Sequence, residues 1–522
     1  MPATVTGPVW AGRGLDQRGG IDPLRVARPV LDTVDRLLPG VSTLTHFARP
    51  YAFYAALAEH CERVDADEEQ RIRLLRRGEV LMAAVTAACQ DAGHLHDRLA
   101  GGKPHGTDGV RPHLGEDRLD LAACAAAHSA EAPLRSYSPR RLGFWSDYRG
   151  PCLSLGVAAG GGALPLPGRH ACPEPVREVF APLFGATAHD HLSRDRLIAL
   201  AEVGAHHLTE AEVLWLAGLF TASEQGIHDP DSWEPEDLHR RAALRILGRT
   251  AALYPESPDW SWEWGWERAF RAAVAYGDTA VTDPVLGTHP QALGWRGTLL
   301  RRFSVGAWRR LWSFVTGCMN DGDSGSGSTE DELRDRVASL MPNTSVRALA
   351  RDLPDTTGGG HPVAAEEGLL DTHDEGSPRL NVELLLLGAR RAGELEGDVR
   401  RAFLGQAKEF LNPLWVAQRR DDLLDRPVAE FAAGLVSDML HQSQRVAREK
   451  TRIGDDGRIT VFSKVRERNG RYYSTGDEGR GEPATRINEM AGLALQLGLI
   501  SEDSGPTGAL TDTGAKLLGV AG

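Results

Sequence analysis

The chain has few cysteines, few lysines and no long apolar run. Its six cysteines are scattered over 522 residues without a CxxC pair, so the spacing indicates free thiols in a reducing cytoplasm. No uninterrupted apolar run, that of Leu384 to Leu387 included, approaches the roughly 18 residues that a membrane span needs. No cationic segment followed by an apolar core opens the sequence. A signal peptide and a membrane partner are therefore not expected.

Lysine accounts for only five of the 59 basic residues, the others being arginine. Together with the high Ala and Gly content, this usage is typical of proteins from GC-rich bacterial genomes. Hydrophobic residues make up 41% of the chain and charged residues 25%, as in ordinary globular proteins. A chain of this length is too long for one core, so several domains are expected.

Helical periodicity dominates the sequence and predicts a mainly α, multi-domain protein. Helices are expected over 30–38, 51–61, 176–184, 192–203, 209–222, 235–253, 267–276 and 295–315, and over the Ala-rich 119–132. A long helix is expected from about 65–68 to Gln90, and a short helical pair over 330–352. Capping boxes are predicted at Asp65/Glu68 and Thr209/Glu212.

Composition divides the chain into five segments. They are a disordered tail (1–20), an N-terminal helical domain (21–175), a Trp-rich helical domain (176–320), a flexible linker or insert with short helices (321–379, ending in a loop over 353–379) and a C-terminal domain (380–522).

The last 80 residues predict a winged-helix-like α+β module. A helix over 427–452 precedes an alternating basic run, and Asn469-Gly470 is a typical two-residue hairpin turn. A second helix over 486–497 is followed by a Gly-rich wing pattern that ends at Gly514. Positions 487, 490, 494 and 497 are expected to be buried on one face of that helix.

Basic residues concentrate in this module. Residues 445–486 hold eleven basic and seven acidic side chains, a net +4 in a chain whose net charge is −13. Such a patch can contact DNA phosphates without reading bases; a solvated charged hairpin is the alternative. The candidate nucleic-acid-binding residues are Arg445, Arg448, Lys450, Arg452, Lys464, Arg466, Arg468, Arg471 and Arg486.

Two distant stretches of the chain share a sequence pattern, here called the internal echo. Leu155-Gly156-Val157 leads through a Gly-rich turn to Gly162-Ala163-Leu164 and then Gly168, and Leu497-Gly498-Leu499 leads similarly to Gly508-Ala509-Leu510 and then Gly514. Each stretch has the form of a helix end, a glycine cap and a short hairpin. A second winged-helix-like unit near 120–175 is one interpretation, and coincidence in a Gly/Ala/Leu-rich chain is the other.

Catalytic signatures are absent. Gly322-Asp323-Ser324-Gly325 has the letters of a serine-protease site but lies in a Gly/Ser linker, without the scaffold that a nucleophile needs. No phosphate loop with GK(S/T) and no HExxH occurs.

Histidines and tryptophans offer weaker signals. The groups 94–97, 189–191 and 206–207, and the set Cys152, His170 and Cys172, lack metal-site spacing, so no metal or cofactor is predicted. Trp260, Trp262, Trp264 and Trp266 alternate, which suits either base stacking or packing against later Trp-containing helices.

The run from Leu38-Pro39-Gly40 through Ser42-Thr43 to Ala48-Arg49 and Tyr51 resembles the opening of large uncharacterised bacterial proteins of phage-defence and DNA-modification islands. Here Pro50 separates an Arg–Tyr pair that those proteins typically keep together. The stretch from Gly143-Phe144-Trp145 to Leu155-Gly156 and the C-terminal helix–hairpin–helix pattern are similar to later parts of the same proteins. The resemblance implies a defence-associated role and assigns no catalytic residue.

Three hypotheses follow. The first is a non-catalytic, DNA-associated subunit of a bacterial anti-phage defence system, acting with a helicase or nuclease partner and binding duplex DNA through phosphates. The second is a metal-dependent nuclease or hydrolase whose site is not recognisable in the sequence. The third is a scaffold that docks protein subunits.

Overall fold

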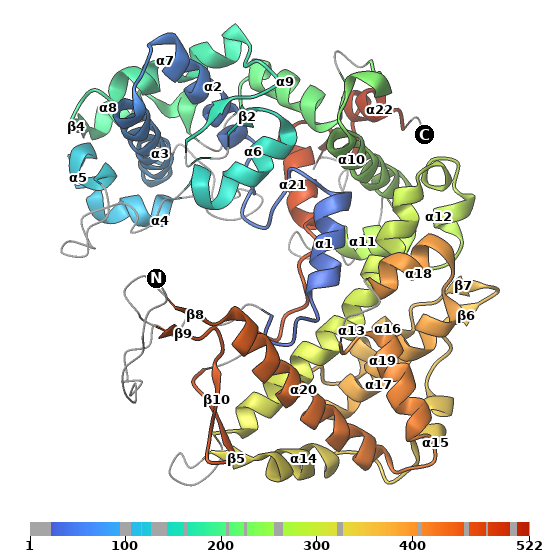
Figure 1. The fold of residues 1–522 in the computed structure, drawn as a ribbon. Helices are drawn as coiled ribbons and strands as arrows, with labels where there is room; N and C mark the ends of the chain where they lie inside the picture. The colour runs from blue at the N-terminus through green and yellow to red at the C-terminus, as the bar shows by residue number, and fades with distance from the viewer. Residues whose placement is uncertain are drawn as a thin grey trace, which may run out of the picture. The chain divides into compact units, whose positions relative to one another are not determined.

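The protein is mainly helical, with short antiparallel strands between the helices (Figure 1). The computed structural model describes residues 22–520 except 94–105, 116, 127–142, 161, 163, 205–207, 224–226, 255–264, 321–326, 406–409, 454–458, 477–478 and 502–508. The predicted tail (1–20) and the Gly/Ser stretch 321–326 lie outside these residues.

Two compact units are assembled from non-contiguous segments. Unit 1 comprises the chain up to Val34, Val274–Asp283 and Ala292–Thr485, and unit 2 comprises Asp35–Ala273, Pro284–Gln291 and Arg486–Gly522. Helices α1 (Arg28–Leu37), α11 (Gly265–Val274) and α13 (Pro290–Cys318) reach across the boundaries between these segments.

Unit 2 is a layered set of helices with three small two-stranded sheets. Its helices are α2 (Arg49–Arg63), α3 (Glu68–Asp91), α4 (Thr107–Val110), α5 (Leu121–Ala125), α6 (Arg149–Leu155), α7 (Glu174–Ala186), α8 (Arg194–Ile198), α9 (Glu210–Phe220), α10 (Pro235–Leu253), α21 (Ile487–Gln496) and α22 (Asp512–Leu518). The antiparallel pairs are β1 (Arg118–Asp120) with β4 (His191–Ser193), β2 (Ala158–Ala159) with β3 (Leu166–Pro167), and β12 (Ile500–Ser501) with β13 (Ala509–Leu510).

Unit 1 is built around α13. Its other helices are α12 (Thr279–Thr282), α14 (Glu330–Ala338), α15 (Val346–Asp352), α16 (Ala365–Thr372), α17 (Pro378–Glu394), α18 (Gly397–Leu404), α19 (Pro413–Asp422) and α20 (Val428–Lys450). Its strands are β5 (Ser328–Thr329), β6 (Thr357–Gly358), β7 (His361–Pro362), β8 (Arg452–Ile453), β9 (Ile459–Thr460), β10 (Val465–Arg468) and β11 (Arg471–Ser474), with sheet order β10-β11-β5 and the pairs β6-β7 and β8-β9.

The core of unit 2 centres on aromatic side chains of α2. Tyr51 is fully buried and meets Tyr148 and Phe220 edge-on, with ring centroids 5.3 Å apart in both pairs. Its hydroxyl donates to the Gly40 carbonyl oxygen at 2.7 Å. Edge-to-face pairs of this kind add to the free energy gained by burying the rings.

An ion pair with no solvent exposure joins α2 to α9. The Arg49 Nε donates to Glu212 Oε1 at 3.1 Å, and a second guanidinium nitrogen contacts the other carboxylate oxygen. Arg49 also donates to the carbonyl oxygens of Glu202 and Gly204. The predicted capping box is confirmed, because the Thr209 side chain and Glu212 cap α9 reciprocally. The Glu212 side chain thus both caps α9 and offsets the buried charge of Arg49.

The other predicted capping box is wrong in register. Helix α3 begins after Asp67, whose carboxylate accepts from the Gln70 backbone while Gln70 returns a bond to the Asp67 amide. Asp65 instead has a positive φ of 49° in the turn before the helix. Because Asp and Asn also tolerate this left-handed conformation, an Asp near a helix start does not by itself identify the cap.

The internal echo corresponds to similar local structures. Gly156 and Gly498 follow α6 and α21 with φ of 76° and 66°, and a backbone bond from the next residue closes each helix end. An antiparallel hairpin follows in both cases, and the return strand of the first, Leu166–Pro167, ends just before Gly168. In both, a later glycine approaches the backbone beside the cap. Both helix–hairpin structures contact α10.

The C-terminal hairpin is confirmed. Strands β10 and β11 pair from Val465 with Ser474 to Arg468 with Arg471, and Asn469 and Gly470 between them have φ of 55° and 73°. Two left-handed residues are what a type I′ turn requires. The predicted apolar face of the second helix is also confirmed, since Ile487, Met490, Ala494 and Leu497 are at most 2% exposed. Helix α20 and this hairpin belong to unit 1, whereas α21 belongs to unit 2.

The loop expected over 353–379 contains regular structure. The hairpin β6-β7 turns through Gly359 and Gly360, both with positive φ, and α16 follows. The helix is fixed by an ion pair between Glu366 and Arg391, both at most 1% exposed in their side chains. A contact 25 residues away therefore orders a stretch whose Gly and acidic content alone predicts a loop.

We expect Gly514→Ala to destabilise unit 2. A Cβ atom at this position would lie 2.0 Å from the Leu499 carbonyl oxygen, which is backbone and cannot step aside. The expected cost is about 1–3 kcal/mol, as for other overpacked sites. Denaturant titration measures it. Gly434→Ala on α20 is the control, because no atom lies within 4 Å of the added carbon; equal losses in both variants would contradict the steric argument.

We expect Glu212→Ala to cost about 3–5 kcal/mol, because it leaves the Arg49 guanidinium buried without its counter-charge. Asp425→Ala removes the partner of Arg347 from a pair whose side chains are 58% and 77% exposed. Such exposed pairs contribute little to stability, because water and salt screen both charges. Thermal melts of both variants test the contrast, and a loss for Glu212→Ala no greater than that for Asp425→Ala would show the prediction to be wrong.

Candidate nucleic-acid interface

Two of the predicted phosphate-binding residues lie on an exposed face of α20. Arg445 and Arg448 follow His441 at positions i+4 and i+7, and all three side chains are exposed. The Arg445 guanidinium carbon lies 5.6 Å from the Phe410 ring centroid. Neither arginine has a carboxylate within ion-pair distance in the part of the chain that the structure describes. Both charges therefore face solvent.

The two basic residues that follow differ from one another. Arg452 is exposed in β8, with its guanidinium carbon 5.9 Å from the Phe462 ring centroid. Lys450 points the other way, and its Nζ lies 3.4 Å from the carbonyl oxygen of Asp22. We call Arg445, Arg448 and Arg452 the arginine row; Lys450 does not belong to it.

The hairpin does not present its basic residues as one charged face. Alternation does bring Arg466 and Arg468 to the same side of β10, opposite Tyr473 and Arg471. Arg466, however, donates to the carbonyl oxygens of its neighbours Ser463 and Val465, and burial lowers its pKa. Arg468 remains exposed.

The remaining predicted residues are engaged or lie elsewhere. Lys464 is half-buried, and Arg471 donates to the Gly327 carbonyl oxygen and pairs with Glu332 at 3.5 Å. Arg486 belongs to unit 2, where it pairs with Asp35 at 2.5 Å and donates to the Val41 carbonyl oxygen at 2.9 Å. Arg471 and Arg486 are therefore engaged in ion pairs within their own units.

The exposed arginines that remain suit contacts with phosphate oxygens. A guanidinium presents several donors in a fixed fork, which matches two phosphate oxygens at once. No base-reading pattern accompanies them, because the row consists of one residue type on one helix face and the strand after it. Contacts of this kind position a duplex and do not read its sequence.

The metal and nucleophile alternatives gain no support. Within the described ranges, no three His, Cys, Asp or Glu side chains converge as ligands for a metal ion would. Burial raises the pKa of the Cys172 thiol to about 12 and that of Cys152 well above its usual value. Both thiols are therefore protonated at neutral pH, whereas thiolates are the reactive form. The predicted histidine groups 94–97 and 206–207 and the Gly322–Gly325 motif lie outside the described residues.

The tryptophan pattern ends in a packed core. Trp266 is 5% exposed in α11, while Trp295, Trp308 and Trp312 of α13 are at most 1% exposed. Trp260, Trp262 and Trp264 lie outside the described residues. For the tryptophans that are described, packing is confirmed over base stacking.

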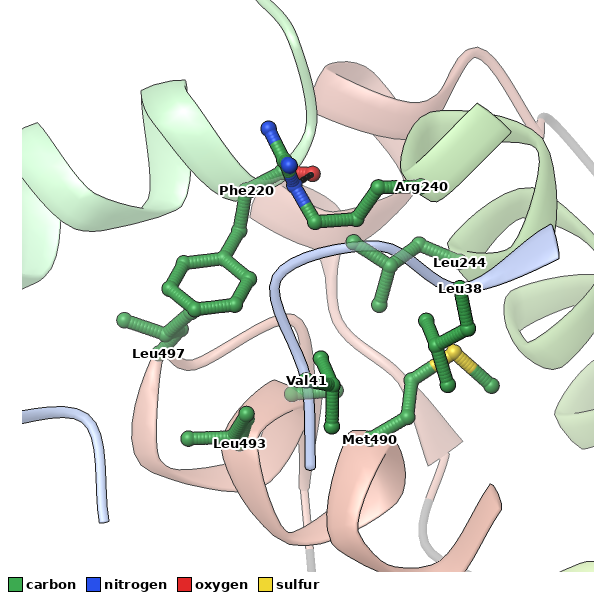
Figure 2. A pocket seen from close by; sticks show the side chains of 9 residues that line it. Leu38, Val41, Phe220, Arg240, Leu244, Met490, Leu493 and Leu497 are labelled. Atoms are coloured by element: carbon green, nitrogen blue, oxygen red, sulfur yellow. Dashed lines mark hydrogen bonds between the residues drawn. The ribbon is translucent and has the colours of Figure 1, made fainter. Parts of the chain in front are cut away.

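A small apolar pocket in unit 2 was not predicted from the sequence (Figure 2). Leucines, Val41 and Met490 line it, with the buried Arg240 at its edge. Arg240 donates hydrogen bonds to Asp237 Oδ1 at 2.5 Å and to the carbonyl oxygens of Leu219 and Phe220. The side chains leave no room for a water molecule. The pocket is therefore part of the core and not a ligand site.

No family model matches this chain, and neither a curated protein nor a solved structure matches it. Among the described residues, no helix has both the length and the apolar character that crossing a lipid bilayer requires.

The different environments of Arg466 and Arg468 lead to a test. Arg466→Ala removes donors to two backbone oxygens beside the hairpin, so we expect a loss of about 1 kcal/mol of stability. Arg468→Ala removes an exposed side chain and is expected to change stability by less than about 0.5 kcal/mol. Denaturant titrations of both variants decide this. If Arg468→Ala is the more damaging change, the assignment of Arg466 as the structural arginine fails.

Proposed function

We propose that this protein is a non-catalytic, DNA-associated subunit that holds duplex DNA through phosphate contacts made by the arginine row. Within that proposal it serves a bacterial anti-phage defence system and acts beside a helicase or nuclease partner. The defence role rests on the resemblance of the Leu38–Tyr54 and 143–156 stretches. The DNA contact rests on the charge distribution of unit 1.

The observation that carries the DNA contact is the clustering of unpaired arginines at the end of α20 and in β8. Some exposed arginines elsewhere in unit 1 are paired, as Arg347 is with Asp425, and unpaired ones such as Arg336 and Arg400 have no second arginine three or four positions away. Arg445, Arg448 and Arg452 have no such partner among the described residues, although acidic side chains outnumber basic ones in the chain. Unpaired like charges at helical spacing repel one another, and a polyanion relieves that repulsion.

Because the arginine row lies near the C-terminal end of α20, its charges could serve to stabilise the helix and not to bind DNA. Positive side chains in the last turn of a helix stabilise it by about 0.3–1 kcal/mol through the helix dipole. This effect accounts for charge near Arg448 and Lys450. It does not account for Arg445, which lies earlier in α20, or for Arg452, which lies beyond its end.

The proposal keeps only part of the predicted winged-helix-like module. Helix α21, the hairpin β12-β13 and α22 form the part of the pattern that lies within unit 2. We propose that this part docks protein partners, because the exposed arginines lie on α20, β8 and β10 and not on α21. Protein docking, the third hypothesis, is thus proposed as a second role, carried by α21, β12-β13 and α22.

We expect the triple variant Arg445→Ala, Arg448→Ala and Arg452→Ala to bind duplex DNA at least about tenfold more weakly than the natural protein. Phosphate contacts release counterions, so each lost contact also lowers the slope of log affinity against log salt by about 1. Fluorescence anisotropy with duplexes of unrelated sequence, from about 50 mM salt upward, measures both quantities.

Its matched control replaces Arg63, Arg73 and Arg336, exposed arginines of other helices, with Ala. This variant has the same net charge as the first triple and should retain binding. If both triples lose affinity equally, the effect is one of net charge and the arginine row is not the interface. If the natural protein does not bind duplex DNA at about 50 mM salt, where such contacts are strongest, the DNA proposal fails and protein docking remains.

A further inference from the structure

The chain segment Gly479–Thr485, here called the strap, runs along α13 within unit 1. The Arg480 Nε donates to the Ser313 hydroxyl at 3.0 Å. Further along, the Pro483 carbonyl oxygen accepts from the Arg302 Nε at 2.9 Å. The strap is thus held to the helix by polar contacts that involve three of its turns.

One acidic side chain of the strap lies between two arginines of α13. Glu482 Oε2 is 3.2 Å from the Arg302 Nε, and its Oε1 is 3.3 Å from the Arg310 Nη1. The arginine side chains are only 8% and 5% exposed, whereas the Glu482 side chain is 18% exposed. The carboxylate is therefore the solvent-facing member of a largely buried cluster.

The space that the Glu482 carboxylate occupies is open because α13 has a glycine there. Gly306 lies midway between the arginines, so that positions 302, 306 and 310 share one face of α13 at successive intervals of four. A Cβ atom at 306 would lie 2.9 Å from the Glu482 Cγ and 2.9 Å from the Arg310 Nη1. Any larger residue at this helix position would fill the space in which the carboxylate lies.

The described contacts do not satisfy every donor of the cluster. The Glu482 carboxylate contacts both guanidiniums, and burial together with the nearby Arg310 charge lowers the pKa of Arg302 despite Glu482. The Arg310 Nε is satisfied by Asn381 Oδ1 at 2.9 Å. Its Nη2 is buried and has no hydrogen-bond acceptor among the described residues. The cluster therefore keeps a buried donor that Glu482 does not satisfy.

We propose that Arg302, Gly306 and Arg310 form a phosphate-binding cradle in which Glu482 is an internal, displaceable ligand. The cradle does not rest on the DNA proposal, since none of its residues belongs to the arginine row.

A phosphate group suits the cradle better than the carboxylate does. At neutral pH a phosphate monoester carries about −1.5 to −2 charges and three strong acceptor oxygens. It can therefore offset both guanidiniums and accept from the Arg310 nitrogen that Glu482 leaves unused. Planar guanidinium groups bind such oxygens in pairs. Exposed glycines at 479 and 481 flank Glu482, so the strap has little packed structure to lose when the side chain swings outward.

The test uses full-length Glu482→Ala and Glu482→Gln variants, the second of which keeps the shape of the side chain without its charge. We expect both to melt below the natural protein, because two buried guanidiniums lose their counter-charge. About 20 mM inorganic phosphate should then raise their melting temperature by at least about 3 °C more than sodium chloride of equal ionic strength. Calorimetry should give a phosphate Kd at least about tenfold tighter than in the natural protein, where the internal carboxylate competes.

The matched control is Glu366→Ala, which removes a buried carboxylate from a single arginine of the same unit. Arg391 retains the carbonyl oxygens of Thr356 and Val363 as acceptors, so phosphate should not stabilise this variant beyond the salt effect. If phosphate stabilises the Glu482 variants no more than chloride, or no more than it stabilises Glu366→Ala, the cradle proposal is overturned and Glu482 is a structural counter-ion only.

Two ligand sources share this chemistry, and a second arm separates them. Adenosine monophosphate is titrated into Glu482→Gln beside inorganic phosphate. Equal affinities support a site for the phosphate group alone, and tighter binding of the nucleotide supports a nucleotide site. Replacing Arg310 with Gln in the Glu482→Gln background should abolish binding of either ligand; retained binding would place the site elsewhere and refute the cradle.

Discussion

The cost of burying positive charge is the constraint on which much of this structure depends. Arg49, Arg240 and Arg391 are fully buried, and an unpaired guanidinium in such a position would destabilise the fold by several kcal/mol. Each has a carboxylate partner and also donates to backbone carbonyl oxygens, which for Arg240 are those of the last turn of α9. A guanidinium has five donors, so one arginine can fix an acidic side chain and two loop backbones together. An ammonium group cannot cover such a planar set of acceptors, which gives the preference for arginine a structural use in this fold.

The same constraint limits how a basic segment can be interpreted from sequence. Charge between residues 445 and 486 is visible in the sequence, but the partners of those charges are not. Lys450 approaches the Asp22 backbone and Arg486 pairs with Asp35, both more than 400 positions away. Arg466 binds to its own neighbours' carbonyl oxygens. These contacts, which for Lys450 and Arg486 are with distant residues, distinguish the three side chains from Arg448, whose side chain remains in solvent.

Local rules, in contrast, predicted several local structures correctly, although the cap of α3 is Asp67 and not Asp65. The Asn469-Gly470 turn follows from backbone sterics, and the Thr209/Glu212 cap from hydrogen-bond geometry; neither depends on distant residues. The apolar spacing of α21 gave its buried face for the same reason. The order in 353–379 could not be predicted in this way, because Arg391 supplies the contact that fixes Glu366. The five-segment division of the chain stays a prediction, while the two compact units draw on segments far apart in sequence.

The glycine at the centre of the α13 cradle also has an evolutionary consequence. A glycine within a helix lowers helix stability by roughly 0.5–1 kcal/mol relative to alanine, so helix stability alone favours its replacement. Position 306 can accept a larger residue only where the side chain at 482 becomes shorter, because the two compete for the same space. In homologous sequences, a larger residue at position 306 should therefore occur together with a smaller residue at position 482. The residues at these two positions would show which homologues keep the cradle.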